Sequence, residues 1–155
     1  MMDDTRKQLI DNIRIAIADK SDEKEIFQAA VELIDGFNED FNWTGFYVRK
    51  GRLLEVGPYI GPETPHKTIE LNRGICGAAA VTGRTIIVDD VNSDARFLAC
   101  SITTKSEIVV PLMDGDNCLG EIDIDSDKPG RFTTQDKAML EAIAETVVTR
   151  LKQIR

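Results

Sequence analysis

Apolar residues recur at helical spacing near both ends of the chain. Toward the N-terminus, Leu9, Ile13 and Ile17 are four residues apart, which places their side chains on one face of a helix. A polar break at residues 19–22 divides this region, so we predict two helices within residues 1–36.

The last part of the chain repeats this pattern. Within residues 133–155, Met139, Ile143, Val147 and Leu151 form a stripe at steps of four. We therefore predict a long C-terminal helix. Terminal helices with single apolar stripes often pack together, so we expect these helices to share one face of the central structure.

The middle of the chain, residues 42–126, changes to a period of two that is typical of strands. The segments predicted as strands are 43–50, 52–60, 68–71, 84–88, 106–113 and 118–125, with a short helix at 74–82. This order of elements indicates an α+β fold with a mostly antiparallel central sheet. At 155 residues, the chain suits a single domain with one hydrophobic core.

Charge narrows the range of partners. The chain has 27 acidic and 19 basic residues, for a formal net charge of -8. Such an excess repels nucleic-acid phosphates and anionic membranes, so we expect neither as a partner. No apolar run approaches the roughly 20 residues of a membrane helix, and the N-terminus lacks a signal-peptide pattern. We therefore expect a cytoplasmic protein.

The cysteines are the next candidates for chemistry. Cys76, Cys100 and Cys118 form an odd count without a CxxC pair, and His66 is the only histidine. This pattern predicts neither a disulfide framework nor a metal site. Cys100 lies in the long polar stretch 89–105, which favours exposure over burial, and long loops in small domains are often functional.

A predicted strand near the C-terminal end carries three carboxylates in the sequence EIDID. Side chains alternate along a strand, so Glu121, Asp123 and Asp125 share one face while Ile122 and Ile124 pack on the other. The acidic face is either an ordinary solvated sheet surface or the floor of a pocket. In a pocket, the carboxylates would hold an ammonium ion, and one could stay protonated.

Three further residues fit a pocket of this kind. Glu107 opens the strand after the polar stretch, as a solubilising charge or as a carboxylate at the pocket rim. Trp43 and Tyr47 are four apart on one strand and share a face. Such a pair is more often core than ligand wall, but it could also contact a small methylated or thioether group.

Four motifs, in this order, carry a family resemblance: NWTGFY, LNRGICGAAAVTGRTIIVDDV, LACS–TKSEIVVPL and LGEIDIDS. They are similar to the free methionine-(R)-sulfoxide reductases, which are GAF-fold homodimers that reduce the free amino acid. The likeness runs from Asn42 to the final helix. It implies a GAF-like fold, a homodimer, no bound cofactor, and free methionine sulfoxide or a similar small zwitterion as substrate.

The resemblance also implies roles for residues. Cys100 would be the nucleophile that becomes a sulfenic acid as methionine leaves. The substrate-binding residues would be the aromatic pair and the carboxylates already described: Trp43, Tyr47, Glu107, Asp123 and Asp125. Independently of the resemblance, crowded carboxylates disfavour a thiolate, and our hypothesis is that Arg96 or Lys105 compensates for them.

The chain departs from the family pattern where recycling is concerned. His66 stands where family members carry a recycling cysteine, and Phe97–Ser101 differs from the usual sequence around the nucleophile. Cys76 matches the family's GxCG cysteine and is the remaining intramolecular candidate to resolve the sulfenic acid; otherwise an external, thioredoxin-like thiol must do so. Cys118 matches no family thiol and is expected as buried filler. The alternative function is a GAF small-molecule sensor with little or no turnover.

Overall fold

The computed structural model describes residues 2–98 and 103–155. Every predicted helix and strand is present there, with ends within a few residues of the expected ones. In chain order the elements are α1 (Asp4–Ile17), α2 (Glu23–Asp35), β1 (Trp43–Lys50), β2 (Leu53–Ile60), β3 (Thr68–Glu70), α3 (Gly74–Thr82), β4 (Ile86–Val88), a 3₁₀ turn (Val91–Ser93), β5 (Ser106–Asp114), β6 (Asn117–Ser126) and α4 (Thr134–Ile154).

The strands form one sheet in the order β3-β2-β1-β6-β5-β4, and all neighbours are antiparallel. The predicted antiparallel sheet is therefore confirmed. Two hairpins, β1–β2 and β5–β6, meet at the centre, where β1 pairs with β6 although most of the sheet's sequence separates them. This pairing places the acidic strand β6 in the middle of the sheet.

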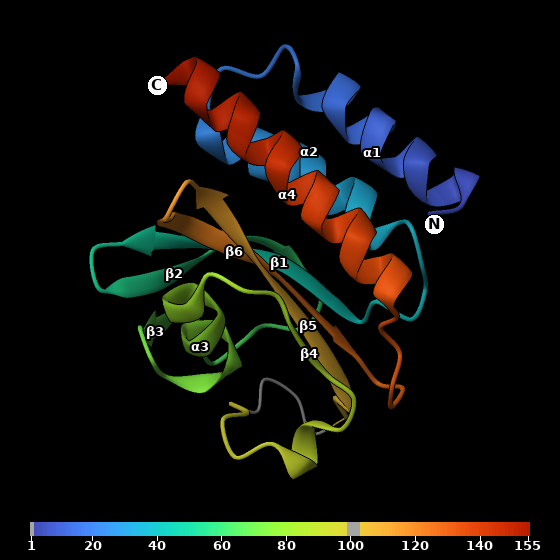
Figure 1. Ribbon diagram of the computed structural model, residues 1–155, viewed down its shortest axis with the longest axis vertical. Helices are drawn as coiled ribbons and strands as arrows, with labels where there is room; N and C mark the ends of the chain where they lie inside the picture. Colours follow the sequence, from blue (N-terminus) through green and yellow to red (C-terminus); the bar gives the residue numbers. More distant parts are fainter. Residues whose placement is uncertain (1, 99–102) are drawn as a thin grey trace.

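The N- and C-terminal helices cover one face of the sheet, as predicted (Figure 1). Helices α2 and α4 lie against the strands, and α1 packs on α2 and α4. The core between these layers joins apolar residues of the strands to the predicted helix stripes; its fully buried members include Phe46, Ile108, Ile122, Ile124, Ile13, Ile26, Ile34, Met139 and Ile143. No helix in the described ranges is long and apolar enough to cross a membrane.

A buried carboxylate anchors the start of α4. Asp136 is fully buried and accepts hydrogen bonds from Arg6 (2.8 Å), Arg131 (3.0 Å) and the backbone N–H of Thr133 (2.9 Å). Thr133 in turn caps the helix, which completes a capping box. Burial alone would raise the pKa of Asp136, but the hydrogen bonds and positive charges around it bring that pKa below its ordinary value.

The opposite face of the sheet is covered differently. Short helix α3 packs there on β5 and β6, on the side of the sheet away from the terminal helices (Figure 1). The side chains between them form a second apolar cluster that includes Trp43, Tyr47, Cys76 and Val109. Trp43, Tyr47 and Cys76, which were singled out from the sequence, therefore lie on this second face.

Candidate active site

The carboxylates of β6 are buried on the face toward α3. The exposed fractions of Glu121, Asp123 and Asp125 are 0%, 1% and 2%. The solvated sheet surface, one of the two alternatives that the sequence left open, is therefore wrong. Ile122 and Ile124 point to the helical layer, as predicted from the alternation.

Strand register places further groups around these carboxylates. Glu107 of β5 lies directly opposite Asp125, and Val109 lies opposite Asp123. On the other side of β6, Asp123 faces Gly45 of β1. Glu107 is also buried, with 5% of its surface exposed, so the pocket-rim carboxylate joins the acidic group rather than the solvent.

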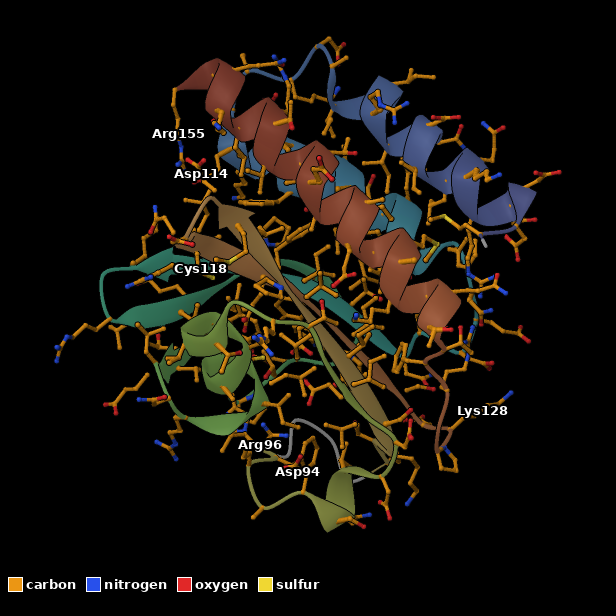
Figure 2. All side chains as sticks on the ribbon, in the orientation of Figure 1. Asp94, Arg96, Asp114, Cys118, Lys128 and Arg155 are labelled. Atoms are coloured by element: carbon orange, nitrogen blue, oxygen red, sulfur yellow. The ribbon has the colours of Figure 1, made fainter. Side chains whose placement is uncertain are left out.

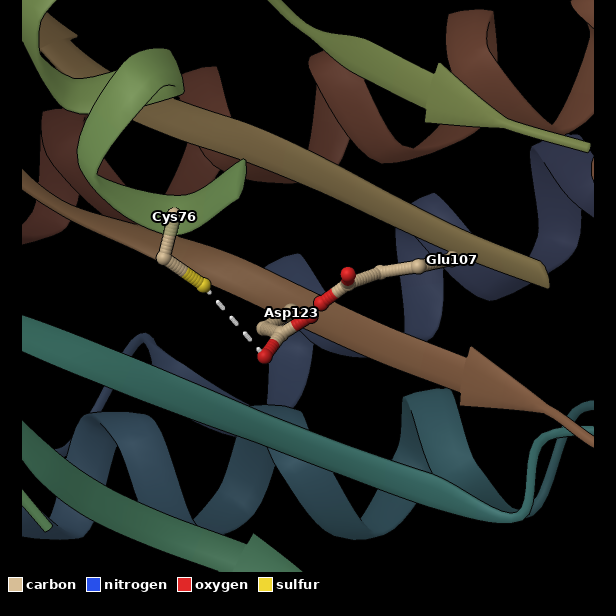
Figure 3. Close-up of side chains that lie close together, drawn as sticks. All are labelled: Cys76, Glu107 and Asp123. Atoms are coloured by element: carbon tan, nitrogen blue, oxygen red, sulfur yellow. Dashed lines mark hydrogen bonds between the residues drawn. The ribbon is translucent and has the colours of Figure 1, made fainter. Parts of the chain in front are cut away.

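Cys76 joins the same group from α3. Its thiol donates a hydrogen bond to Asp123 Oδ2 across 3.5 Å. The ligand-type atoms of Cys76, Asp123 and Glu107 all lie within 4.8 Å of one another. In Figure 3, the Cys76 side chain points from α3 toward Asp123, and the Glu107 side chain reaches Asp123 from the neighbouring strand.

Most oxygens of this acidic group lack a hydrogen-bond donor among the described residues. These are both carboxylate oxygens of Glu121, both of Asp125, and Oδ1 of Asp123. A buried polar atom without a partner costs about 1–3 kcal/mol, and more when it is charged. Such atoms indicate a place where a positively charged or hydrogen-bonding ligand belongs.

The burial of these groups changes their protonation. Burial raises the pKa of Glu121 and of Asp125 well above the ordinary range, and it raises that of Asp123 as well. Burial, followed by the charges of Asp123, Glu121 and Glu107, also raises the pKa of the Cys76 thiol well above its usual value. Cys76 is therefore a protonated thiol at neutral pH, and the carboxyl groups can hold protons for chemistry.

Aromatic rings form one wall beside the carboxylates. Trp43 stacks on Tyr59, with ring centres 5.1 Å apart, and lies 6.2 Å from Tyr47. A Cβ atom at Gly45 would lie only 2.5 Å from Cη2 of the Trp43 ring, so glycine is needed for the ring to cover this strand. Trp43 and Tyr47 thus share a face, as predicted. Tyr59 was missed, because only the pairing of β2 with β1 brings it to the wall.

One segment, residues 62–66, accepts hydrogen bonds from the polar atoms of two of these rings. Trp43 Nε1 donates to the carbonyl of Pro62 (3.1 Å), and the Tyr47 hydroxyl donates to the carbonyl of His66 (2.8 Å). The backbone of His66, which the resemblance matched to a recycling cysteine, is therefore hydrogen-bonded directly to a ring of the aromatic wall. His66 as a whole is partly exposed.

The predicted nucleophile, Cys100, lies outside the described residues. On its N-terminal side, Leu98 packs against Gly74 at the start of α3: a Cβ there would lie 2.8 Å from Leu98 Cδ1, and the φ of Gly74 is +69°. On the C-terminal side, Thr103 and Thr104 line a small cavity of about 50 Å³ whose walls include Trp43, Asp125, Asn42, Pro62 and Asp127.

Two other candidates, Cys118 and Arg96, have hydrogen-bond partners outside the acidic group. Cys118 is buried at the start of β6, and its thiol donates to the carbonyl of Gly120 (3.2 Å), which agrees with a structural role. Arg96 forms an ion pair with Asp94 (2.7 Å), on the loop below α3 in Figure 2. This pair occupies the guanidinium that was expected to offset the acidic group.

Comparisons with known proteins agree with this architecture. Residues 20–151 match the GAF domain family. The chain is 42% identical over 112 residues to the free methionine-R-sulfoxide reductase of Saccharomyces cerevisiae, a match that covers 70% of this chain. The matched part spans only 62% of the length of that yeast protein.

Solved structures extend the likeness to nearly the whole chain. The free methionine-R-sulfoxide reductase from Neisseria meningitidis, solved in complex with its substrate, superposes with a TM-score of 0.91 at 29% identity, covering 98% of this chain and 92% of its own. The reduced form of the Staphylococcus aureus enzyme superposes with a TM-score of 0.89 at 32% identity, covering 94% of each chain. Sequence and structure together show that the chain belongs to the GAF-domain family of free methionine-R-sulfoxide reductases.

Proposed function

We propose that this protein reduces free methionine-R-sulfoxide to free methionine. The observation that carries the proposal is the buried acidic face of β6, whose carboxylate oxygens lack donors among the described residues while an aromatic wall stands beside them. A free amino acid offers the α-ammonium group for the carboxylates and an apolar sulfur end for the rings. The activities named for the yeast and staphylococcal relatives support this choice.

Each part of the site has a role in binding. Asp125, Asp123 and Glu107 would hold the ammonium group, because their buried oxygens gain most from a cationic donor. Trp43 and Tyr47 would contact the methyl and thioether end. A protein-bound methionine has no α-ammonium group, so the acidic floor would also select the free amino acid.

Cys100 would carry out the reduction. Its thiolate attacks the sulfoxide sulfur, the S–O bond of the substrate breaks, and the oxygen becomes the hydroxyl of a sulfenic acid on Cys100. The substrate sulfur gains the two electrons that the cysteine sulfur loses, and methionine leaves. A carboxyl group with a raised pKa, such as Asp125, supplies the proton that the oxygen needs. Among the described residues near Cys100, Thr103 and Thr104 share a small cavity with Asp125. Leu98 packs at the start of α3, the helix that carries Cys76. Both contacts support this assignment.

Recycling would then proceed through a second thiol. The sulfenic acid condenses with that thiol to a disulfide and releases water, and two electrons from an external dithiol restore the enzyme. Cys76 is the intramolecular candidate because it lies on the same acidic group. Its raised pKa makes it a slow thiol, which favours direct attack by an external, thioredoxin-like reductant.

The test is methionine release from free methionine-(R)-sulfoxide with dithiothreitol and then with thioredoxin. We expect release by the wild type and a loss of at least about 10³-fold in Cys100→Ser. Cys118→Ser is the matched control, because that thiol is buried and bonded to its own strand. Binding of methionine without release by the wild type would instead identify a GAF sensor, the alternative function.

We also propose a cytoplasmic homodimer. The two described cysteines, Cys76 and Cys118, are reduced thiols, which fits a reducing compartment. Ile15 on α1 is 72% exposed although it is large and apolar, and it lies on the layer of terminal helices. Light scattering of the wild type and of Ile15→Glu would test the assembly; a monomeric wild type would contradict it.

A further inference from the structure

The aromatic wall contains one ring to which the proposed function gives no role. Tyr59 is a half-buried residue of β2 whose ring stacks on Trp43, with ring centres 5.1 Å apart and an angle of 20° between the planes. We propose that Tyr59 is a positioning residue that fixes the Trp43 ring and thereby limits the size of the S-alkyl group that the site accepts. This inference rests on the proposed function, because it concerns which free sulfoxide the protein prefers.

Strand register explains why Tyr59 reaches the wall. Tyr59 pairs with Gly45 of β1, and Gly45 pairs on its other side with Asp123 of β6. Residues directly opposite one another on paired strands share a face of the sheet, so these three form one row. Gly45 has no side chain and leaves a gap in the middle of that row. The gap therefore lies between Tyr59 and the acidic group.

The Trp43 ring fills this gap from the neighbouring row. A Cβ atom at Gly45 would lie 2.5 Å from Cη2 and 2.7 Å from Cζ3 of Trp43, and also 2.7 Å from Cβ of Tyr59. The opposite edge of the indole is fixed by the hydrogen bond from Nε1 to the carbonyl of Pro62. The ring is thus held at one edge by a hydrogen bond and on one face by Tyr59. Truncation of Tyr59 would remove the second of these restraints.

The place of the Trp43 ring matters because it borders the space for substrate. Trp43 pairs with Asp125 across β1 and β6, and both residues line the cavity of about 50 Å³ described above. A cavity of this size has room for only a few water-sized groups. One extra methylene in an apolar pocket changes selectivity by about 10–200-fold. A fixed Trp43 ring would therefore distinguish a methyl from an ethyl group on the sulfoxide sulfur.

The kinetic experiment compares free methionine-(R)-sulfoxide with free ethionine-(R)-sulfoxide, which is longer by one methylene on sulfur. With dithiothreitol as reductant, Tyr59→Ala should raise KM for the methyl substrate at least about 10-fold and leave kcat within about 3-fold. The preference for methyl over ethyl, expressed as a ratio of kcat/KM values, should fall at least about 5-fold. Tyr59→Phe retains the stacked ring and should behave like the wild type.

The matched control is the next residue of the same strand. Ile60 is also half-buried, but it packs on the core under the terminal helices and not on the aromatic wall. Ile60→Ala therefore weakens β2 without touching Trp43, and it should change neither KM nor the preference for the methyl substrate. Circular dichroism checks that each variant is folded.

A binding experiment makes the result independent of turnover. Trp43 is the single tryptophan of the chain, so its fluorescence reports the surroundings of this ring alone. In protein with Cys100→Ser, which lacks the proposed nucleophile, Tyr59→Ala should shift the emission to longer wavelength because water reaches the indole. Quenching titrations with the two sulfoxides should give dissociation constants whose ratio moves toward one. Tyr59→Phe should alter neither reading.

Each outcome has one meaning. Unchanged emission and an unchanged ratio of dissociation constants in Tyr59→Ala would overturn the inference. A Tyr59→Phe variant that loses as much as Tyr59→Ala would also overturn it, since the hydroxyl group and not the stacked ring would then be responsible. If the binding ratio changes as expected but the wild type releases no methionine, the inference about Tyr59 holds and the proposed reductase activity fails.

Discussion

The two faces of strand β6 are equally buried, but one carries apolar side chains and the other carries carboxylates. Ile122 and Ile124 are fully buried under α2 and α4, in the larger apolar core of the protein. Asp123 and Asp125, their neighbours in sequence, are 1% and 2% exposed on the other face. Apolar burial stabilises the fold, whereas carboxylate burial without donors opposes it. The comparison teaches that the helical face provides stability and the α3 face uses part of that stability to hold a binding site.

A second pair of buried carboxylates sharpens the contrast. Asp136 accepts hydrogen bonds from two arginines and from the backbone N–H of Thr133, and its pKa is below the ordinary value. Asp125 has no donor among the described residues, and its pKa is well above that value. Asp136 is therefore a structural acid, whereas the raised pKa and missing donors of Asp125 are typical of a ligand-binding group.

The largest effect is expected where a paired carboxylate is removed. Asp136→Ala leaves the guanidinium groups of Arg6 and Arg131, which are only about 15% exposed, without their shared partner. We expect the free energy of unfolding in urea to fall by about 3–5 kcal/mol. Asp3→Ala removes an exposed partner of Arg6 and should cost less than about 1 kcal/mol. Equal losses in both variants would contradict the distinction.

Truncation on the apolar face should follow. Ile122→Ala creates a cavity between β6 and the helices, and we expect a loss of about 2–5 kcal/mol in urea unfolding. The exposed Val81 of α3 is the control, and Val81→Ala should change stability by less than about 0.5 kcal/mol. A loss below about 1 kcal/mol for Ile122→Ala would show that the helical face is not the main source of stability.

On the acidic face, one substitution should increase the stability of the fold and weaken ligand binding. Asp125→Asn replaces a carboxyl whose pKa is raised by burial with a neutral amide, so stability at pH 8 should rise because no buried charge can form at this position. Binding of free methionine, measured by calorimetry, should weaken by at least about 10-fold. The exposed Asp127→Asn should change neither quantity. A destabilised Asp125→Asn would show that the carboxylate is structural.

The smallest effect is the pH dependence of that gain. A carboxyl whose pKa is raised on folding binds more protons in the folded than in the unfolded state, so the stability of the unliganded wild type falls as pH rises above about 4. Asp125→Asn lacks one such group and should show a flatter curve. The two proteins should therefore converge below about pH 4 and diverge toward pH 8 in thermal unfolding at matched ionic strength. Parallel curves would contradict the raised pKa of Asp125.

Much of this architecture could be predicted from the sequence. Helix stripes such as Leu9, Ile13 and Ile17 and the alternation of EIDID depend only on local periodicity, so the elements and the directions of their side chains follow without tertiary information. The shared face of Trp43 and Tyr47 follows for the same reason. The family motifs then named the candidate residues.

What covers each face was decided only by the tertiary structure. Alternation determines which side chains share a face, but packing of α3 determines that the acidic face is buried and not solvated. The contact of Cys76 with Asp123 spans 47 residues, and that of Arg6 with Asp136 spans 130. Such distant pairings depend on strand order and helix placement, so identical residue types became a paired structural acid in one place and an unpaired binding group in another.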